Sequence, residues 1–287
     1  QTVTSPDPQG AVPVRSGPSW HDLGPRLLSA AVIVAVIATG LYFGGYVFAI
    51  LAAIVFGITY REWEQMVTLK PLAPLGMAML GLLALAAVAY PTFGWLGVIA
   101  LIAIALLVAT FGDKAVLPWR IGGLVFFGVV LIAVLAMRGY GPAGVVAGWY
   151  LGIVIALNDT GAYFVGRVIG GPKLAPAISP AKTWAGSIGG WVIGTLAGTL
   201  YWIIFTHSPW GYGLAFSAIL GIVGQVGDLT ESAIKRVFRV KDSGDIIPGH
   251  GGFMDRLDSV TFGVLLLFLI GLVHGGIGNV SGGFLNW

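Results

Sequence analysis

The chain has 287 residues, of which 57% are hydrophobic and only 9% are charged, and its mean hydropathy is +0.91. This composition excludes a water-soluble domain and indicates a protein that lies largely in a lipid bilayer. The absence of cysteine excludes disulfides, thiolate zinc sites and cysteine nucleophiles. The net charge of +3 does not indicate nucleic-acid binding, because basic residues in a membrane protein mostly report topology and contacts with anionic headgroups.

Residues 1–20 are rich in Pro, Ser, Gly and Gln and contain no apolar run, which predicts a flexible tail. The rest of the chain is dominated by apolar runs approaching 20 residues, long enough to cross a bilayer as helices. We therefore predict an all-α, polytopic integral membrane protein with about nine transmembrane helices. The expected spans are 26–42, 45–60, 74–90, 95–111, 121–138, 143–158, 187–206, 212–227 and 260–276.

The first two spans are separated only by Gly44 and Gly45, so that a long hairpin and a merged pair are both compatible with the sequence. The first span is interpreted as an anchor, because no convincing cleavage site follows it and further spans do. We divide the chain into a cytoplasmic tail at 1–20, N-terminal transmembrane helices at 21–142 and a C-terminal transmembrane catalytic region at 143–287.

Basic residues predict the orientation. With nine spans, the N-terminus and the segments after spans 2, 4, 6 and 8 share one side, and every Lys and Arg except Arg138 falls on that side. The positive-inside rule makes this side cytoplasmic. All 12 acidic residues fall there too. We therefore expect the N-terminus and any polar chemistry at the cytoplasmic face.

The segment that follows span 8 is the more informative of two polar segments. In a helix, Asp228, Glu231, Ser232 and Lys235 would form one stripe, since their spacing is i, i+3, i+4 and i+7. Asp255 and Asp258 are spaced i, i+3 at the entry to span 9. Two helix ends could thus present carboxylates to one site, and Mg²⁺ prefers one or two carboxylates together with substrate phosphates. Taken singly, each of these residues is equally compatible with a solvated cap or an ion pair.

Between these carboxylates the chain reads Pro-Gly-His-Gly-Gly at 248–252, which predicts a loop. Gly251 and Gly252 could offer backbone N–H groups to a phosphate, and His250 could donate to it. A tight turn into span 9 is the competing interpretation, and the two are compatible.

The segment after span 6 carries the second set of candidates. Asp159 is expected at the end of span 6, where a helix-end polar anchor is the alternative role. Ser179, Lys182 and Thr183 precede span 7, and they could bind phosphate through one ammonium and two hydroxyls. A juxtamembrane lysine that only reports topology is the competing account for Lys182.

The stretch from Ser232 to Asp258 resembles the signature of the phosphatidate cytidylyltransferases, also called CDP-diacylglycerol synthases. Its pattern is Ser, Lys-Arg, Lys-Asp, Pro-x-His-Gly-Gly and Asp-Arg-x-Asp. Supporting similarities lie at 159–163, 173–176, 179–183 and 227–228, so that the resemblance covers about residues 155–265. One departure is Ala185, at a position where the family often has Glu or Gln, which puts the role of that side chain in doubt.

The resemblance implies an enzyme that joins CTP and phosphatidic acid to give CDP-diacylglycerol and pyrophosphate, in the inner (plasma) membrane. It implies Mg²⁺ dependence, a monovalent cation such as K⁺ at the metal site, and a homodimer. The catalytic residues that we predict are Asp228, Asp255, Lys235 and Lys182. The predicted metal ligands are Asp228 and Asp255, with Asp258 and Asp159 as weaker candidates. The residues predicted to bind CTP are Ser179, Thr183, Ser232, Arg236, Lys241, Asp242, His250, Gly251, Gly252 and Arg256.

Two other functions are weighed against this one. A CTP-dependent polyprenol or phytol kinase would release CDP instead of pyrophosphate. An ion-coupled transporter would place charge near the membrane midplane and have related halves, whereas here the charge gathers at one face and the halves are dissimilar.

Overall fold

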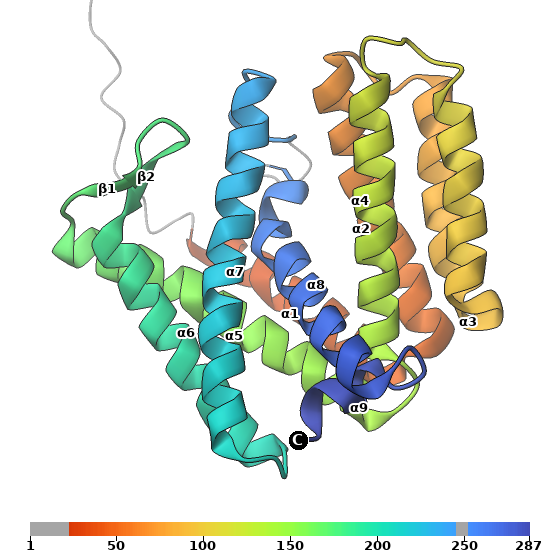
Figure 1. Ribbon diagram of the computed structural model, residues 1–287. Helices are drawn as coiled ribbons and strands as arrows, with labels where there is room; N and C mark the ends of the chain where they lie inside the picture. Colours follow the sequence, from red (N-terminus) through yellow and green to blue (C-terminus); the bar gives the residue numbers. More distant parts are fainter. Residues whose placement is uncertain (1–22, 245–251) are drawn as a thin grey trace, which may run out of the picture. The chain divides into compact units, whose positions relative to one another are not determined.

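The computed structural model describes residues 23–244 and 252–287, with side chains from residue 31 on (Figure 1). The predicted tail at 1–20 and the candidates His250 and Gly251 lie outside this range. By internal contacts the chain divides into residues 1–38 and residues 39–287. The first unit contains most of one apolar helix, and the second contains the rest of the fold.

The described residues form nearly all helix. The elements are α1 (Leu23–Phe43), α2 (Gly45–Thr68), α3 (Pro74–Ala109), α4 (Leu117–Arg138), α5 (Pro142–Ile169), β1 (Lys173–Ala175), β2 (Ser179–Thr183), α6 (Trp184–Phe205), α7 (Trp210–Val237), η2 (Met254–Arg256), α8 (Asp258–Gly275) and α9 (Val280–Leu285). Within the described ranges, the seven helices α2 to α8 are long and apolar enough to cross a membrane, and Ala31–Phe43 of α1 is a shorter apolar helix. The all-α, polytopic class is confirmed, whereas nine spans remain a prediction.

The difference in count arises at α3, which contains two of the expected spans, and at α1, of which Ala31–Phe43 is a shorter apolar helix. Gly94 has φ +60° and ψ −156°, a conformation open in practice only to glycine, and it interrupts the helix. The chain doubles back there, so that the two halves of α3 lie side by side (Figure 1). Gly44 separates α1 from α2 with nearly the same backbone angles, φ +60° and ψ −154°. The first two spans are therefore separate helices and not a merged pair.

Several helix ends differ from the expected ones. Helix α5 continues to Ile169, so that Asp159 lies inside a helix and not at its end, where we had expected it. Helix α7 continues to Val237, which confirms the helical stripe from Asp228 to Lys235. The segment before α6 contains a small antiparallel sheet, in which Lys173 pairs with Thr183 and Ala175 with Ser179. This hairpin was not expected from the sequence.

Within residues 39–287, charged and uncharged connections lie at opposite ends of the helices. The connections at 69–73, 110–116 and 170–183 and residues 238–244 after α7 lie at the upper end in Figure 1. The junction between α1 and α2, the bend within α3 and the turns at 139–141, 206–209 and 276–279 lie at the lower end. This agrees with the predicted one-sided distribution of charge; which end faces the cytoplasm remains a prediction.

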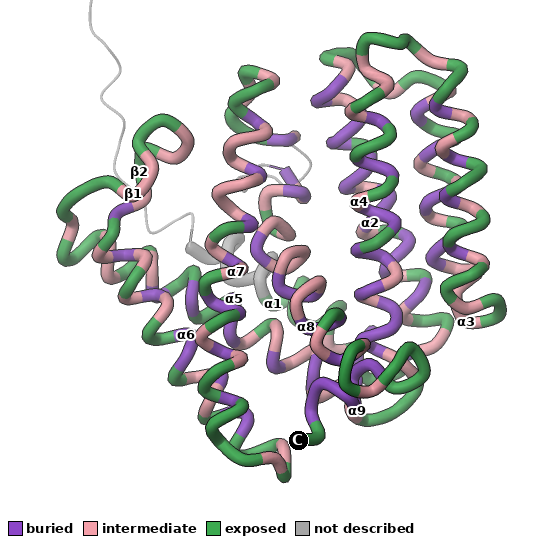
Figure 2. Tube along the Cα trace, in the orientation of Figure 1, coloured by how far each residue is buried: buried purple, intermediate pink, exposed green. Residues whose placement is uncertain are grey.

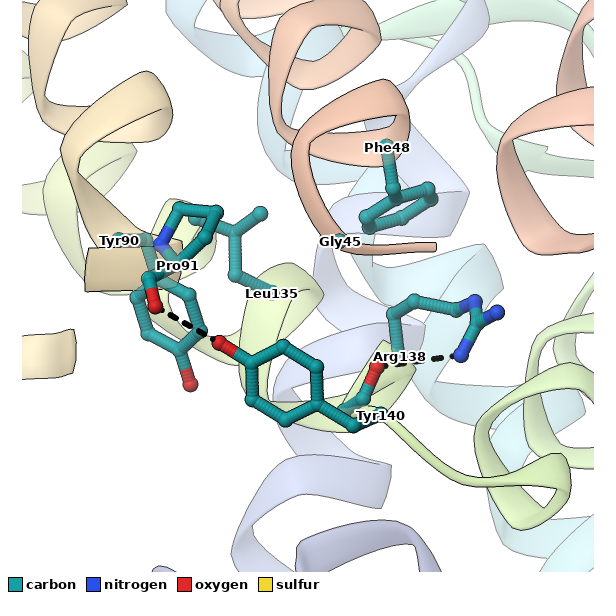
Figure 3. Close-up of a pocket in the computed structure, with 8 residues that line it drawn as sticks. Gly45, Phe48, Tyr90, Pro91, Leu135, Arg138 and Tyr140 are labelled. Carbon is teal, nitrogen blue, oxygen red and sulfur yellow. Dashed lines mark hydrogen bonds between the residues drawn. The ribbon is translucent and has the colours of Figure 1, made fainter. Parts of the chain in front are cut away.

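Arg138 ends α4 at the lower end, and backbone carbonyls accept hydrogen bonds from its guanidinium. Its side chain is only 6% exposed, and its guanidinium donates hydrogen bonds to the carbonyls of Gly139 at 3.1 Å and of Tyr42 at 3.2 Å. Tyr140, beside it, donates to the carbonyl of Pro91 at 3.0 Å (Figure 3). Arg138 thus joins the turn after α4 to the end of α1, which gives it a structural role.

A line of glycines brings α5 and α6 into close contact. A Cβ added at Gly190 would collide with the carbonyl oxygen of Asn158, and one added at Gly186 would lie 2.6 Å from that of Ala162. Small residues at four-residue spacing let membrane helices approach until their backbones touch. Buried positions are frequent on α2 and α4 (Figure 2). Large apolar side chains such as Leu196 and Ile204 are exposed, as expected of a surface that faces lipid.

Candidate active site

Three predicted carboxylates come from three helices at the charged end. Asp159 lies on α5, Asp228 on α7 and Asp258 at the first position of α8. Asp159 and Asp258 each interact electrostatically with Asp228 and with Lys182, and Asp258 also interacts with Asp159. The two polar segments of the sequence, far apart along the chain, thus meet at one place.

The β-hairpin supplies the cation of this group. Thr183 ends β2 and accepts a hydrogen bond from the N–H of Gly186 at 3.1 Å, so that it caps the start of α6. Lys182, one residue earlier, forms an ion pair with Asp228. The two side chains are 29% and 28% exposed, so the pair remains accessible to an aqueous ligand.

A second group lies one to two turns further along α7. The ammonium of Lys235 is 2.6 Å from Oδ1 of Asp255 and 3.3 Å from Oε1 of Glu231. Oδ2 of Asp255 accepts hydrogen bonds from the N–H groups of Ser243 and Gly252, both at 3.1 Å. Burial raises the pKa of the Asp255 carboxyl, but its hydrogen bonds with Glu231, Lys235 and Ser243 and the charge of Lys235 outweigh this effect, so that the pKa lies below its usual value.

The contacts connect the candidate residues in two neighbouring groups, one around Asp228 and one around Lys235 and Asp255. Glu231 connects them, because it pairs with Lys235 and interacts electrostatically with Asp258. Among the described residues, no three acidic or histidine side chains converge closely enough to hold a metal ion as they stand. Oxygen donors of the kind that Mg²⁺ prefers are nevertheless gathered around Asp228.

The remaining predicted residues surround these groups. The hydroxyl of Ser232 is 3.5 Å from Oδ1 of Asp228. Arg236 donates to the carbonyls of Ile178 and Val240, both at 3.2 Å, and so holds the β-hairpin against the end of α7. Ser179 lies half-buried in β2, whereas Lys241, Asp242 and Arg256 are exposed.

Gly252 fits its place because it has no side chain. A Cβ there would collide with the hydroxyl of Ser243 and lie 2.9 Å from Oδ2 of Asp255. The structure thus assigns to this glycine a close backbone contact with a carboxylate of the site.

Two buried acidic residues on α2 were missed from the sequence. Glu62 and Glu64 are almost completely buried. Glu64 forms a two-pronged ion pair with Arg120 of α4, with its shortest contact at 2.6 Å. Glu62 accepts hydrogen bonds from Ser243, Phe253 and Met254, which belong to the signature segment. The sequence offered little signal, because the two acidic residues follow the expected span 45–60 in a polar stretch that also contains Arg61 and Gln65.

An apolar cavity of about 280 Å³ adjoins the second group. Trp63, Phe126 and Phe262 contribute to its wall, and Glu231 and Asp258 give it a polar edge. It lies between α2, α4, α7 and α8, so that apolar space and the carboxylates adjoin.

The fold defines a polytopic membrane protein, and the candidate site lies at one end of its helices. The model of the cytidylyltransferase family matches residues 25–274. The phosphatidate cytidylyltransferase of Brucella suis biovar 1 (strain 1330) is 34% identical over 256 residues, which are 88% of this chain and 94% of that protein. The chain therefore belongs to the cytidylyltransferase family, and it is a nucleotidyltransferase.

Shorter similarities agree. The phosphatidate cytidylyltransferase of Bacillus subtilis (strain 168) is 40% identical over 147 residues, 51% of this chain and 55% of that protein. That of Staphylococcus haemolyticus (strain JCSC1435) is 47% identical over 123 residues, 42% of this chain and 47% of that protein.

Proposed function

We propose that this protein is a CTP:phosphatidate cytidylyltransferase, which makes CDP-diacylglycerol and pyrophosphate for phospholipid synthesis. Membership of the cytidylyltransferase family supports the assignment. The observation that carries it is the accessible ion pair of Lys182 with Asp228, which lies at the charged end of the helices. A water-soluble triphosphate and a lipid phosphate can meet at such a place.

The proposed reaction is a single in-line displacement. An oxygen of the phosphatidate phosphate attacks the α-phosphorus of CTP, the bond from that phosphorus to the bridging oxygen breaks, and pyrophosphate leaves. The attacking phosphate is already an anion near neutral pH, so that no general base is required. Such transfers depend on positioning and charge neutralisation. We propose no covalent intermediate with the enzyme.

Basic residues from both polar segments would neutralise the triphosphate. Lys182 is half-buried and can exchange its contact with Asp228 for a phosphate oxygen, since both are anionic. Lys235 is held by two carboxylates, and we propose that it faces the leaving pyrophosphate. Arg236 and Lys241 would add charge at the rim.

Mg²⁺ is the proposed metal, and the donor set fits it. Asp228 interacts with two further carboxylates, Asp159 and Asp258. We propose that Asp228 holds the ion and that Asp159 and Asp258 would have to move closer to it to become further ligands. Asp255 is a predicted ligand whose oxygens already accept bonds from Lys235, Ser243 and Gly252; it would have to exchange one of these contacts. Bound Mg²⁺ would neutralise charge on the triphosphate. A monovalent cation such as K⁺ remains an expectation from the resemblance.

The apolar cavity fits the lipid substrate. Its aromatic wall can take an apolar chain, while its polar edge at Glu231 and Asp258 adjoins the charged groups. We further propose that the protein lies in the inner (plasma) membrane of a bacterium as a homodimer, with the charged end in the cytoplasm. The bacterial relatives and the apolar helices support the membrane assignment.

One assay tests the proposed function. Purified protein is incubated with phosphatidate, Mg²⁺ and each nucleoside triphosphate in turn, and lipid-linked nucleotide, pyrophosphate and CDP are measured. We expect CDP-diacylglycerol and pyrophosphate in equal amounts with CTP, and neither product with the other nucleoside triphosphates. Release of CDP with a phosphorylated lipid would instead identify a CTP-dependent lipid kinase.

A further inference from the structure

Glu62 lies on α2, outside the signature, and its carboxylate is completely buried with 0% exposure. Oε2 accepts hydrogen bonds from the hydroxyl of Ser243 at 3.0 Å and from the N–H of Met254 at 2.8 Å. Oε1 accepts one from the N–H of Phe253 at 2.9 Å. A buried carboxylate is tolerated when such donors satisfy it, so that these three contacts explain why Glu62 can lie here.

The donors to Glu62 belong to two chain segments that Asp255 also joins. Ser243 lies on one segment, and Gly252 to Met254 lie on the other. Asp255 accepts from the N–H groups of Ser243 and Gly252, while Glu62 takes the hydroxyl of Ser243 and the next two N–H groups. Ser243 is therefore shared, and direct contacts run from Glu62 through Ser243 and Asp255 to Lys235.

The segment is packed closely against Glu62. A Cβ added at Gly244 would lie 2.8 Å from Oε1 of Glu62. A carboxylate in such contact fixes the backbone that surrounds it, because any shift of that backbone breaks buried hydrogen bonds.

Glu64 offers an informative comparison on the same helix. It is buried to 2% exposure, and it pairs with the guanidinium of Arg120. No Lys or Arg within the described part of the chain forms an ion pair with Glu62. Glu64 thus joins two helices, whereas Glu62 is directed at the backbone of the signature segment.

We propose that Glu62 is a positioning residue for nucleotidyl transfer. It touches no substrate, and it acts by holding Ser243 and residues 252–254 so that Asp255 and Lys235 stay aligned. The inference rests on the proposed function, since alignment is measured through turnover. It extends the machinery of the reaction to α2, outside the residues that the signature contains.

The test compares Glu62→Gln and Glu62→Ala with the matched control Glu64→Gln. In steady-state assays we expect Glu62→Gln to lower kcat at least tenfold while KM for CTP and for phosphatidate changes less than threefold. Glu62→Ala should lower kcat further, because glutamine keeps one accepting oxygen and alanine keeps none. Glu64→Gln should lower the thermal midpoint in detergent but keep kcat within threefold of wild type. Folded Glu62 variants with wild-type kcat, or an equal loss of kcat in Glu64→Gln, would overturn the proposal.

A second variant, at Ser243, tests the proposal even if the Glu62 variants do not fold. Ser243→Ala removes one of the three donors and should lower kcat about threefold to tenfold without changing KM; an unchanged kcat would also overturn the proposal. Hydrogen exchange gives a readout that does not depend on activity. Peptides that cover 252–257 should exchange faster in Glu62→Gln, or in Ser243→Ala if Glu62→Gln does not fold, than in Glu64→Gln. Absence of turnover in the wild type would contradict the proposed function. Unchanged hydrogen exchange in the peptides that cover 252–257 would contradict the positioning role, so that the two failures are distinguishable.

Discussion

The ammonium nitrogen of Lys235 lies 2.6 Å from Oδ1 of Asp255, and the contact joins α7 to η2 across the signature segment. Both side chains are largely buried, at 10% and 14% exposure, and Glu231 provides a second carboxylate to the same ammonium. Lys182 and Asp228, by contrast, form an ion pair whose partners are each more than a quarter exposed. Four residues that the sequence predicts to act together thus occupy two different environments, and this difference leads to distinct expectations for their variants.

Replacement of the two lysines should have different consequences. Lys182→Ala should lower kcat/KM for CTP tenfold to a thousandfold, equivalent to about 1.4–4 kcal/mol for a lost charge-assisted contact, and should leave the thermal midpoint nearly unchanged. Lys235→Ala should lower both kcat/KM and the thermal midpoint, because it leaves the largely buried Asp255 carboxylate without its cation. Arg61→Ala is the control, since Arg61 is exposed and should change kcat/KM less than about threefold. If all three variants behave alike in CTP titrations, the triphosphate binds elsewhere.

Replacement of Asp228 and of Asp255 should distinguish the loss of a Mg²⁺ ligand from the loss of a stabilising ion pair. Asp228→Asn should lower turnover on the order of a thousandfold or more, with little change in thermal midpoint, because Asp228 is accessible and is a proposed Mg²⁺ ligand. Asp255→Asn should also abolish turnover, but it should cost about 3 kcal/mol of stability, because the partly buried Lys235 loses its closest partner. Activity and melting curves across a Mg²⁺ titration measure both effects. More than a tenth of wild-type activity in either variant at saturating Mg²⁺ would show that the residue is not required.

The depressed pKa of Asp255 predicts a loss of stability in acid. Because this pKa is lower in the folded protein than in the unfolded chain, the ionised carboxylate stabilises the fold above the unfolded value of about 3.9. That contribution is lost as the pH falls from about 3.9 through the lower folded pKa. The thermal midpoint in detergent, measured between about pH 6 and pH 3, should fall more steeply for the wild type than for Asp255→Asn. Parallel curves would mean that Asp255 does not contribute to the acid dependence.

Single-cysteine labelling can test the orientation, because the chain contains no cysteine. Lys114 and His207 are both exposed, and they lie in connections at opposite ends of the helices. In intact cells a membrane-impermeant maleimide should label His207→Cys, and it should label Lys114→Cys only after permeabilisation. The reverse pattern would contradict the cytoplasmic assignment of the charged end.

The sequence by itself determined the class of the protein and the distribution of its charge. Apolar runs require helices in a bilayer, because an unpaired backbone group in lipid is too costly. The helical stripe from Asp228 to Lys235 also followed from local spacing, as α7 confirms. The residues of the signature indicated the family, and the comparisons agree.

Only the tertiary structure decided which of these residues face one another. Local periodicity places Asp228 and Lys235 on one helix face, but their partners Lys182 and Asp255 come from other elements, and helix packing selects them. The β-hairpin that carries Lys182 is short and has no periodic signal. Glu62 was missed for the same physical reason: its partners are far along the chain, and only the packing of α2 brings its carboxylate against Phe253 and Met254.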